Sequence, residues 1–517
     1  MSTHETDLAD ALTAAESGMA VAYWASRAPE RVAVRERARN LTFHQLNARA
    51  NALVRALRHA DLKPGDGVAL LCSNQLEYAE VIVARERTGM RLIPLNWHLS
   101  SSEIAYIVND SDARAIIADV AFADVARTVA VGLDIRLAIG GPIPGFDDYH
   151  QLIALQPAHD IDDSVRGSTM TYTSGTTGRP KGGYRPADPV VTIEMINFYD
   201  YRGESDAALC TGPLYHTAVL AYSLILPLLA GTRVVLMHSW DASEALRLIT
   251  EERITHTHMV PIMFSRLLAL PAEVRAGADL SSLRFVIHGA APCPVAVKLR
   301  MMDWLGPIVW EYYAATEGRA TLCDPTTWLL RPGTVGRPVI EGAVIVGDAE
   351  GRPLPPGTVG LLWLRSTVDT AFQYWRDEVK TAEAYRGDLF TLGDVGYSDD
   401  EGYLYLTDRS SDLIISGGVN IYPAEVDAVL IEHPFVADSA TIGESDEQWG
   451  ERVLSLIELA PSVEASADLA GELIAWARDR MAHYKCPRRV EFVASVPRSE
   501  AGKVLRSRLR SEYRAQS

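Results

Sequence analysis

The chain has 517 residues and a formal net charge of −18, with 48% hydrophobic and 22% charged residues. At roughly 150 residues per folding unit, this length suggests about three units. The composition is that of an ordinary globular protein. The acidic balance argues against general binding to nucleic acid or to an anionic membrane. It leaves room for a local basic pocket that holds an anionic cofactor.

The N-terminal segment and the cysteines indicate the compartment. MSTHETDLADALTAAESG lacks the basic start and the apolar run of a signal peptide. The most apolar long run, residues 219–230, contains Pro227, is too short to cross a bilayer and predicts a buried helix. We therefore expect a cytoplasmic protein with no integral membrane segment. The five cysteines form no CxxC pair and no metal-ligand spacing, which predicts reduced thiols at Cys72, Cys210, Cys293, Cys323 and Cys486.

Strand-like and helix-like patterns alternate over the first three quarters of the chain. Residues 67–74 predict a buried strand, residues 77–89 an amphipathic helix, and RLIPLN a second strand. The runs RAIIAD, TRVVLM and RFVIHGAA repeat the strand pattern. Residues 241–253 repeat the helix pattern, with Asp241 or Ser243 as the candidate N-cap. This alternation predicts an α/β fold with layered, largely parallel sheets.

The pattern changes near residue 331. Residues 331–408 contain many glycines and prolines between short β-like pieces, which predicts a β-rich subdomain. From residue 409 a smaller unit mixes strands such as ADSATIGE with helices such as AEVDAVLIEH. We expect an N-terminal domain at residues 1–408 and a small α+β C-terminal domain at residues 409–517.

The segment TYTSGTTGRPKG (residues 171–182) contains three glycines, five Ser or Thr hydroxyls and one lysine. Glycine and competing hydroxyls disfavour a regular helix or strand. A solvated turn fits this composition. A phosphate-binding loop fits it as well, because glycine amides, hydroxyls and a lysine all stabilise oxyanions. The Walker spacing GxxxxGK[ST] is not met.

Five motifs occur in a fixed order: TYTSGTTGRPKG, YYAATEG, TLGDVGY, YLTDRSSDLIISGGVNIYPAEVD and PRSEAGKVLR. With these motifs the chain resembles the adenylate-forming superfamily from about Ala25 to its C-terminus. That superfamily contains acyl-CoA synthetases, carrier-protein adenylation domains and luciferase. PLYHT, IHGAAPCPVAVK and ISGGVNIYPAE are most similar to fatty-acid, bile-acid and aryl-acid CoA ligases. The resemblance implies ATP-dependent activation of a carboxylic acid as acyl-AMP, followed by transfer to CoA, with Mg²⁺ as the metal.

The resemblance assigns the nucleotide-binding groups. Glu317 is the expected Mg²⁺ ligand and Thr316 the expected α-phosphate contact, while Tyr313 stacks near the adenine. Asp394 accepts from both ribose hydroxyls, and Arg409 reaches the same ribose. The expected phosphate cradle consists of Thr173, Ser174, Gly175, Thr176, Thr177, Gly178 and Lys181, and the expected adenine wall of Gly289, Ala290 and Ala291.

The C-terminal domain is implied to rotate between two half-reactions. One orientation brings Lys503 to the acyl-adenylate, where a cation bridges the carboxylate and the α-phosphate. The other brings Gly417 and Gly418 to a thiol channel. The implied hinge lies near Arg409–Ser411. Many relatives carry Asp or Lys where this chain has Ser411, a departure that weakens the inference of a two-state cycle.

The acyl pocket is implied near residues from several motifs. His216 is either a gate between the pocket and the thiol channel, or a group that orients the acyl carbonyl, or a core histidine bonded to a backbone carbonyl. Arg319 indicates a second negative group on the substrate, or else pairs with a local carboxylate such as Asp324. The remaining implied pocket residues are Met195, Tyr199, Ala221, Gly289, Ala314, Ala315 and Leu322.

Three alternatives to an acid–CoA ligase stay open. The first is adenylation for a carrier protein, which would be the macromolecular partner. The second is activation of nitrite to diazotise an aryl amine in secondary metabolism. The third, a non-catalytic nucleotide- or acyl-binding protein, is disfavoured because Lys503, Glu317 and the phosphate loop are all retained. A small carboxylic acid is the expected ligand, and a homodimer is the candidate assembly.

Overall fold

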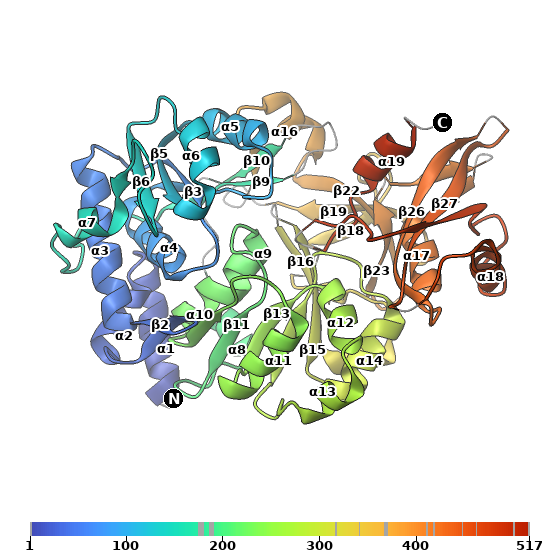
Figure 1. Ribbon diagram of the computed structural model, residues 1–517, viewed down its shortest axis with the longest axis horizontal. Helices are drawn as coiled ribbons and strands as arrows, with labels where there is room; N and C mark the ends of the chain where they lie inside the picture. The colour runs from blue at the N-terminus through green and yellow to red at the C-terminus, as the bar shows by residue number, and fades with distance from the viewer. Residues whose placement is uncertain are drawn as a thin grey trace. The chain divides into compact units, whose positions relative to one another are not determined.

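The structure is a computed structural model (Figure 1). Its contacts divide the chain into two compact units. The first comprises Met1–His258, Pro271–Val286 and Thr367–Thr381, and the second Met259–Leu270, Ile287–Ser366 and Ala382–Ser517. The structure describes residues 3–173, 180–185, 191–315, 318–340, 342–366, 371–409, 412–416, 419–446, 448–461, 463–499 and 502–514.

A six-stranded sheet forms the centre of the first unit, with the strand order β7-β6-β5-β3-β4-β8 and parallel neighbours throughout. The strand β3 and the helix that follows it confirm the elements predicted for residues 67–89, but the helix is buried on nearly all sides and is not amphipathic as predicted. The strands are β3 (Gly67–Leu71), β4 (Arg91–Pro94), β5 (Ala113–Asp119), β6 (Ile135–Ile139), β7 (Asp147–Asp148) and β8 (Ser168–Thr169). The helices around it are α3 (Phe43–His59), α4 (Leu76–Thr88), α5 (Ser101–Asp110), η1 (Val120–Phe122), α6 (Ala123–Val129) and α7 (Tyr149–Ala154).

Local sequence signals explain where several of these helices begin. Thr42 and Gln45 form a capping box at the start of α3, and Ser100 and Glu103 form another at α5. Asp241 caps α11 (Ala242–Glu251) by accepting from the backbone N–H of Glu244 at 2.8 Å. Of the two predicted caps for this helix, Asp241 is therefore the one used.

Five strands of a second sheet also belong to the first unit, in the order β13-β11-β12-β1-β2. All neighbours are parallel except the antiparallel pair β1 and β2. The bounds are β1 (Val32–Glu36), β2 (Arg39–Thr42), β11 (Ala207–Cys210), β12 (Arg233–Leu236) and β13 (His256–Met259). Further helices of this unit are α1 (Thr3–Ala15), α2 (Ala20–Arg27), α8 (Ile193–Phe198) and α13 (Ala272–Gly277). A small antiparallel sheet, β20-β10-β9, joins β9 (Thr171–Thr173), β10 (Lys181–Tyr184) and β20 (Gln373–Tyr374).

The apolar run at residues 219–230 is helical, as predicted, but it is not a regular α-helix. It passes from α9 (Thr217–Leu220) through the π-helical segment η2 (Ala221–Ile225) into α10 (Leu226–Leu229). Most of its apolar side chains are buried. A π-helical turn inserts one extra residue and is frequent at functional sites. Among the described helices, none combines the length and the apolar character needed to cross a membrane.

The second unit contains an antiparallel β-rich sheet, a mixed sheet in its C-terminal part and three further strands. β15 (Val309–Ala315), β16 (Gly318–Cys323) and β17 (Arg337–Pro338) pair in antiparallel order. A β-rich sheet follows, built from β18 (Val344–Gly347), β19 (Gly360–Arg365), β21 (Tyr385–Arg386), β22 (Leu389–Ser398) and β23 (Leu404–Arg409). Other elements here are α12 (Pro261–Leu268), α14 (Val295–Leu305) and α15 (Pro325–Leu330). Three elements, β13 at its last residue, β14 (Phe285–His288) and α16 (Glu378–Ala384), span the boundary between the units.

The C-terminal part of this unit is a small α+β domain. Its sheet contains β24 (Ile414–Ser416), β25 (Val419–Ile421), β26 (Val436–Asp446), β27 (Gly450–Leu459) and β28 (Arg489–Val493). Two helices, α17 (Pro423–Ile431) and α19 (Arg506–Arg514), pack on β26, and α18 (Ala467–Arg478) packs on β28 (Figure 1). The predicted α/β fold with a small C-terminal domain is confirmed. The exact boundaries and the hinge stay predictions, because Ser411 lies outside the described residues.

Two buried histidines on β13 illustrate the packing of the first unit. The Nε2–H of His256 donates to the carbonyl of Tyr199 at 2.6 Å, and its ring stacks on Tyr201 with centroids 4.3 Å apart. The His258 ring lies parallel to the Tyr222 ring at 5.5 Å. Burial lowers the pKa of His256 to about 4, against the opposing charge of Asp206, and it lowers the pKa of His258 to about 3.

Both histidines are therefore neutral in the folded protein over a pH range where they are charged in the unfolded chain. Their contribution to stability is complete above about pH 6.5 and is lost progressively as the pH falls toward 4. We expect each histidine to lower the free energy of unfolding at pH 4.5 by on the order of 2 kcal/mol relative to its value above pH 6.5. In urea unfolding, the His256→Asn/His258→Asn double variant should show a flatter pH dependence between 6.5 and 4.5 than the wild type. An unchanged slope would contradict this assignment.

Candidate active site

The ends of the predicted phosphate loop are held in a β-hairpin. Thr173 on β9 pairs with Lys181 on β10 in antiparallel register. The composition of this segment predicts no regular strand, and that prediction is wrong at its two ends, which form β9 and β10. The Lys181 ammonium lies 5.4 Å from the centre of the Tyr374 ring on β20. The loop itself lies outside the described residues, and with it the predicted contacts Ser174, Gly175, Thr176, Thr177 and Gly178; only the backbone of Thr173 is described.

Residues that the sequence analysis did not single out anchor this hairpin to α5. The Tyr172 hydroxyl donates to the carboxylate of Asp110 at 2.6 Å, and the indole of Trp375 donates to the Asp110 carbonyl at 3.0 Å. The guanidinium of Arg91 lies 4.0 Å from the centre of the Trp375 ring. Burial, together with the Asp110 carboxylate, raises the pKa of Tyr172 well above its ordinary value. Tyr172 lies inside the glycine-rich motif, so its position there is the signal that could have identified it.

Two predicted nucleotide-binding residues from separate motifs meet in the second unit. The Tyr313 hydroxyl on β15 donates to Asp394 Oδ2 on β22 at 2.6 Å, and both residues are buried. Asp394 also pairs in backbone register with Arg409 on β23. The side chain of Arg409 lies outside the described part of the structure, as do Thr316 and Glu317. The structure therefore joins the predicted adenine and ribose contacts across 81 positions of sequence.

The predicted adenine wall is a strained turn after β14. A Cβ atom on Gly289 would lie 2.6 Å from Tyr312 Cζ and 2.7 Å from the Tyr312 carbonyl oxygen, so only glycine fits here. Ala290 follows with φ of +66°, in the left-handed region that residues other than glycine rarely adopt. Ala291 is half-buried. Strained backbone of this kind persists only where the surrounding packing holds it in place. It is frequent at turns that bind ligands.

A buried ion pair supports this turn. Lys298 Nζ on α14 donates to Glu311 Oε2 on β15 at 2.7 Å, and His288 Nε2 lies 3.5 Å from the same oxygen. Lys298 is fully buried, and its ammonium lies 4.5 Å from the centre of the Trp328 ring. Burial raises the pKa of Glu311, although Lys298 opposes that change. His288 directly precedes Gly289, so the pair stabilises the base of the wall.

The predicted acyl-pocket residues are divided between the two units. In the first unit Tyr199 is buried in an aromatic cluster with Phe198, Tyr222 and Phe285, and Ala221 begins the π-helical segment. In the second unit the half-buried Ala314 and Leu322 lie on the paired strands β15 and β16. The side chains of Met195, Ala315 and Arg319 are not among those that the structure describes.

Two other predictions concern His216 and Asp324. The half-buried His216 occupies the N-cap position of α9, and its ring centre lies 4.6 Å from that of Tyr215. None of the three roles considered for His216 is decided by this position. The Asp324 carboxylate, the alternative partner for Arg319, accepts from the backbone N–H of Thr327 at 2.8 Å and caps α15.

The C-terminal domain presents Lys503 as an exposed residue shortly before α19. Gly417 and Gly418, between β24 and β25, lie outside the described residues. The described residues contain no group of three His, Cys, Asp or Glu side chains placed to hold a metal ion. The predicted Mg²⁺ ligand Glu317 lies outside the described residues.

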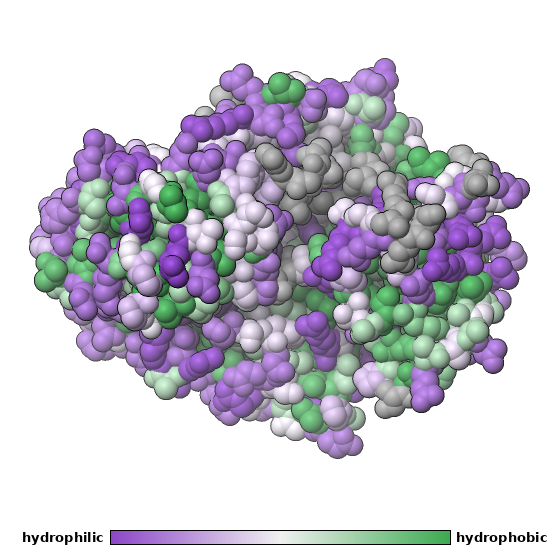
Figure 2. All heavy atoms as spheres, turned by 45° about the horizontal axis from the view of Figure 1, so that its top comes forward, coloured by the Kyte–Doolittle hydropathy of each residue, from purple (hydrophilic) through white to green (hydrophobic). Residues whose placement is uncertain are grey.

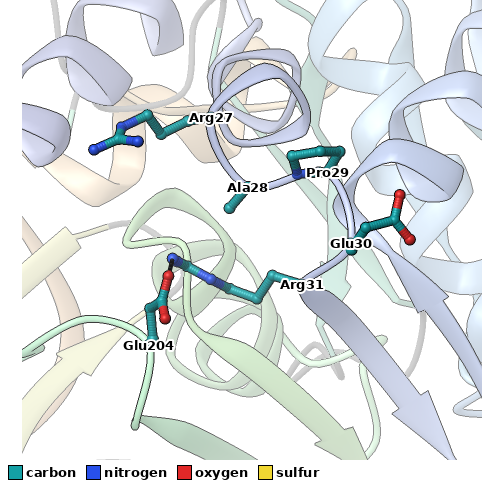
Figure 3. Close-up of a pocket in the computed structure, with 6 residues that line it drawn as sticks. All are labelled: Arg27, Ala28, Pro29, Glu30, Arg31 and Glu204. Carbon is teal, nitrogen blue, oxygen red and sulfur yellow. Dashed lines mark hydrogen bonds and ion pairs between the residues drawn. The ribbon is translucent and has the colours of Figure 1, made fainter.

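A shallow hollow on the first unit lies among Arg27, Ala28, Pro29, Glu30, Arg31 and Glu204 (Figure 3). It contains none of the predicted site residues. Arg31 pairs with Glu204 and donates to the Gly231 carbonyl at 3.1 Å, which braces α2 against the turn before β12. The face drawn in Figure 2 is largely hydrophilic, with separate hydrophobic areas rather than one continuous belt.

Family models match most of the chain. The model of the AMP-binding enzyme matches residues 21–375, and that of the AMP-binding enzyme C-terminal domain matches residues 425–503. The chain belongs to the AMP-binding enzyme family. It is an AMP-forming ligase of the adenylate-forming superfamily, and the predictions of superfamily, fold class and enzyme type are confirmed.

Several characterised relatives of this AMP-binding enzyme match nearly end to end. A fatty acid–[acyl-carrier-protein] ligase, ScoC, from Streptomyces coeruleorubidus is 33% identical over 95% of each chain. A feruloyl-CoA synthase from an Amycolatopsis species is 33% identical over 95% of this chain and 97% of its own. The crystal structure of the anthranilate CoA ligase AuaEII with anthranoyl-AMP is 27% identical, with a TM-score of 0.86 over 96% of this chain and 97% of that one.

Removing the Tyr313 hydroxyl tests its contact with Asp394. We expect Tyr313→Phe to raise the KM for ATP about 5- to 10-fold, because the lost hydrogen bond is worth about 1 kcal/mol. The KM for the acid should change less. The measurement is acid-dependent exchange of pyrophosphate into ATP, with Tyr405→Phe on the neighbouring β23 as the control. An unchanged KM for ATP would show that the pair does not position the nucleotide.

Breaking the buried ion pair tests its structural role. Lys298→Met leaves an uncompensated buried carboxylate and should destabilise the protein by about 3–5 kcal/mol. Without its cation, Glu311 has a folded-state pKa raised further, so the deficit should grow as the pH rises above about 4.3. The Lys298→Met/Glu311→Leu double variant should recover much of the loss in urea unfolding. A double variant as unstable as the single variant would contradict this account.

Proposed function

We propose that this ligase activates a carboxylic acid with ATP and Mg²⁺ as acyl-AMP and then transfers the acyl group to CoA. The observation that carries the proposal is the buried contact between Tyr313 and Asp394, which joins the expected adenine and ribose contacts. The close packing of Gly289 on Tyr312 fixes this turn beside Tyr313, the residue expected to stack near the adenine. The CoA-ligase relatives, aligned over almost the full chain, support the same reaction.

The first step needs two anions to be placed in line. A carboxylate oxygen forms a bond to the α-phosphorus as the bond to the β-phosphate breaks, and pyrophosphate leaves. Lys503 balances the charge that shifts between carboxylate and α-phosphate, and Thr316 orients that phosphate. Glu317 would hold Mg²⁺, which would supply positive charge to the phosphates when bound. The proposed phosphate cradle is Thr173, Ser174, Gly175, Thr176, Thr177, Gly178 and Lys181.

In the second step the CoA sulfur attacks the acyl carbonyl. The carbon–sulfur bond forms, the carbon–oxygen bond to AMP breaks, and the thiol proton passes to solvent. We assign Gly417 and Gly418 to the channel for the thiol and Arg409–Ser411 to the hinge between the two steps. His216 remains the candidate gate. The ribose is held by Asp394 and Arg409.

We expect an aryl or other flat acid to be the preferred substrate. Within the first unit, the aromatic cluster around Tyr199 and the small residue Ala221 are suited to such a group. Feruloyl and anthranilate ligases among the relatives support the same class. Arg319 is the candidate partner for a second polar or negative group on the ring. The proposed location is the cytoplasm, consistent with five free cysteines in the structure.

A carrier protein is the second candidate acceptor. The relative ScoC is named as a fatty acid–[acyl-carrier-protein] ligase, which favours this alternative over nitrite activation. A carrier thiol would enter at the same point of the reaction as CoA. The two acceptors therefore differ in the product and share the acyl-AMP intermediate.

The deciding measurement is AMP release with Mg-ATP and a pool of aliphatic, aryl and steroid acids, with and without CoA, with products identified by mass spectrometry. We expect CoA-dependent turnover and a new thioester, and Lys503→Ala should lower acid-dependent pyrophosphate exchange by about 100-fold or more. AMP or acyl-AMP without a thioester would remove CoA as the acceptor. A carrier protein, or nitrite with an aryl amine, would then be supplied in its place.

A further inference from the structure

Lys503 lies on a loop that closes on itself through backbone hydrogen bonds. The N–H of Ser499 donates to the carbonyl of Lys503 at 2.8 Å, and the N–H of Gly502 donates to the carbonyl of Ser499 at 2.7 Å. The Lys503 N–H donates to the Ser499 hydroxyl oxygen at 3.2 Å. The Leu505 N–H donates to the Pro497 carbonyl at 3.0 Å, which closes the base of the loop. Gly502 has φ of +75°, so a side chain there would strain this turn.

One guanidinium joins this loop to the sheet of the C-terminal domain. Arg498 binds Asp438 on β26 in bidentate fashion, with Nε to Oδ2 at 2.6 Å and Nη2 to Oδ1 at 2.5 Å. Its Nη1 donates to the carbonyl of Gly502, directly before Lys503, at 2.7 Å. The side chains are only 20% and 7% exposed, so water competes weakly for these bonds. A planar, bidentate pair of this kind fixes orientation as well as distance.

A second arginine holds the other end of the loop. Arg506, the first residue of α19, binds Asp427 on α17 at 2.5 Å and donates to the Thr441 carbonyl on β26 at 3.1 Å. Ser439 also donates to Asp427, at 3.0 Å. Lys503 therefore lies between two arginine anchors that reach the same strand. Arg498 is the one that contacts the peptide group next to the lysine.

We propose that Arg498 and Asp438 are positioning residues for the adenylation half-reaction, because they hold the Lys503 loop in the geometry that this step needs. The inference rests on the role of Lys503 in the proposed function. Arg498 acts through the carbonyl of Gly502, in the peptide group next to Lys503, and does not itself contact substrate. The pair serves the adenylation half-reaction only. Thioester formation uses the other orientation of the C-terminal domain and does not need Lys503.

The test separates the two half-reactions in the full-length enzyme. Adenylation is measured as pyrophosphate exchange with ferulate, anthranilate or decanoate, using the acid that the wild type turns over fastest. Thioester formation is measured from the synthetic adenylate of that acid and CoA. We expect Arg498→Gln to lower kcat for adenylation about 10- to 100-fold, with thioester formation within about twofold of wild type. Arg498→Lys should recover part of the loss.

Two further variants control for folding and for loss of an ion pair. Arg452→Gln breaks a comparable pair with Glu444 on the same strand, where Nε and Oε2 are 2.7 Å apart, and should leave both half-reactions unchanged. Ser499→Ala removes only the hydroxyl that accepts from the Lys503 N–H, and should lower adenylation about 2- to 5-fold. It tests the same geometry if Arg498→Gln does not fold.

Equal losses in both half-reactions would assign Arg498 a purely structural role and overturn the inference. Unchanged adenylation in Arg498→Gln, alongside a large loss in Lys503→Ala, would overturn the inference but leave the proposed function intact. Unchanged adenylation in Lys503→Ala, or no exchange with any acid in the wild type, would overturn both.

Discussion

The hydrogen bond from Tyr313 to Asp394 is the contact on which the proposed nucleotide site depends. It connects β15, whose neighbour is β16, with β22 of the separate β-rich sheet. The two sheets are thereby joined at the point where base and ribose are expected to lie. Because both groups are buried, the bond is protected from water and orients the carboxylate.

The turn after β14 shows how the protein maintains backbone strain at such a site. Gly289 lies too close to Tyr312 for any side chain, and Ala290 adopts a left-handed conformation. Strain of this kind persists only where the surroundings determine the backbone strongly. The pair of Lys298 and Glu311, with His288 beside it, provides such surroundings immediately behind the turn. A buried pair is seldom a net source of stability, but it tolerates little displacement.

The C-terminal domain uses a similar arrangement around Lys503, on the domain that we propose to be mobile. The exposed Lys503 lies on a loop that is closed by its own backbone hydrogen bonds. Arg498 and Arg506, on either side of this lysine, both contact β26. A domain that changes orientation must carry its reactive group without losing local geometry. Placing the anchors within the domain meets this requirement, since the contacts of Arg498 and Arg506 described above all lie within residues 427–506.

The sequence by itself determined the family, the fold class and the order of secondary structure. Motif order does not depend on packing, and the alternation of strands and helices follows from local periodicity, as β3, α4 and α11 show. Only the tertiary structure decided which side chains meet. Tyr313 and Asp394, Tyr172 and Asp110, Lys298 and Glu311, and Arg498 and Asp438 are separated by 13 to 81 positions. Such pairs depend on sheet register and on the packing of neighbouring elements, which no local pattern specifies.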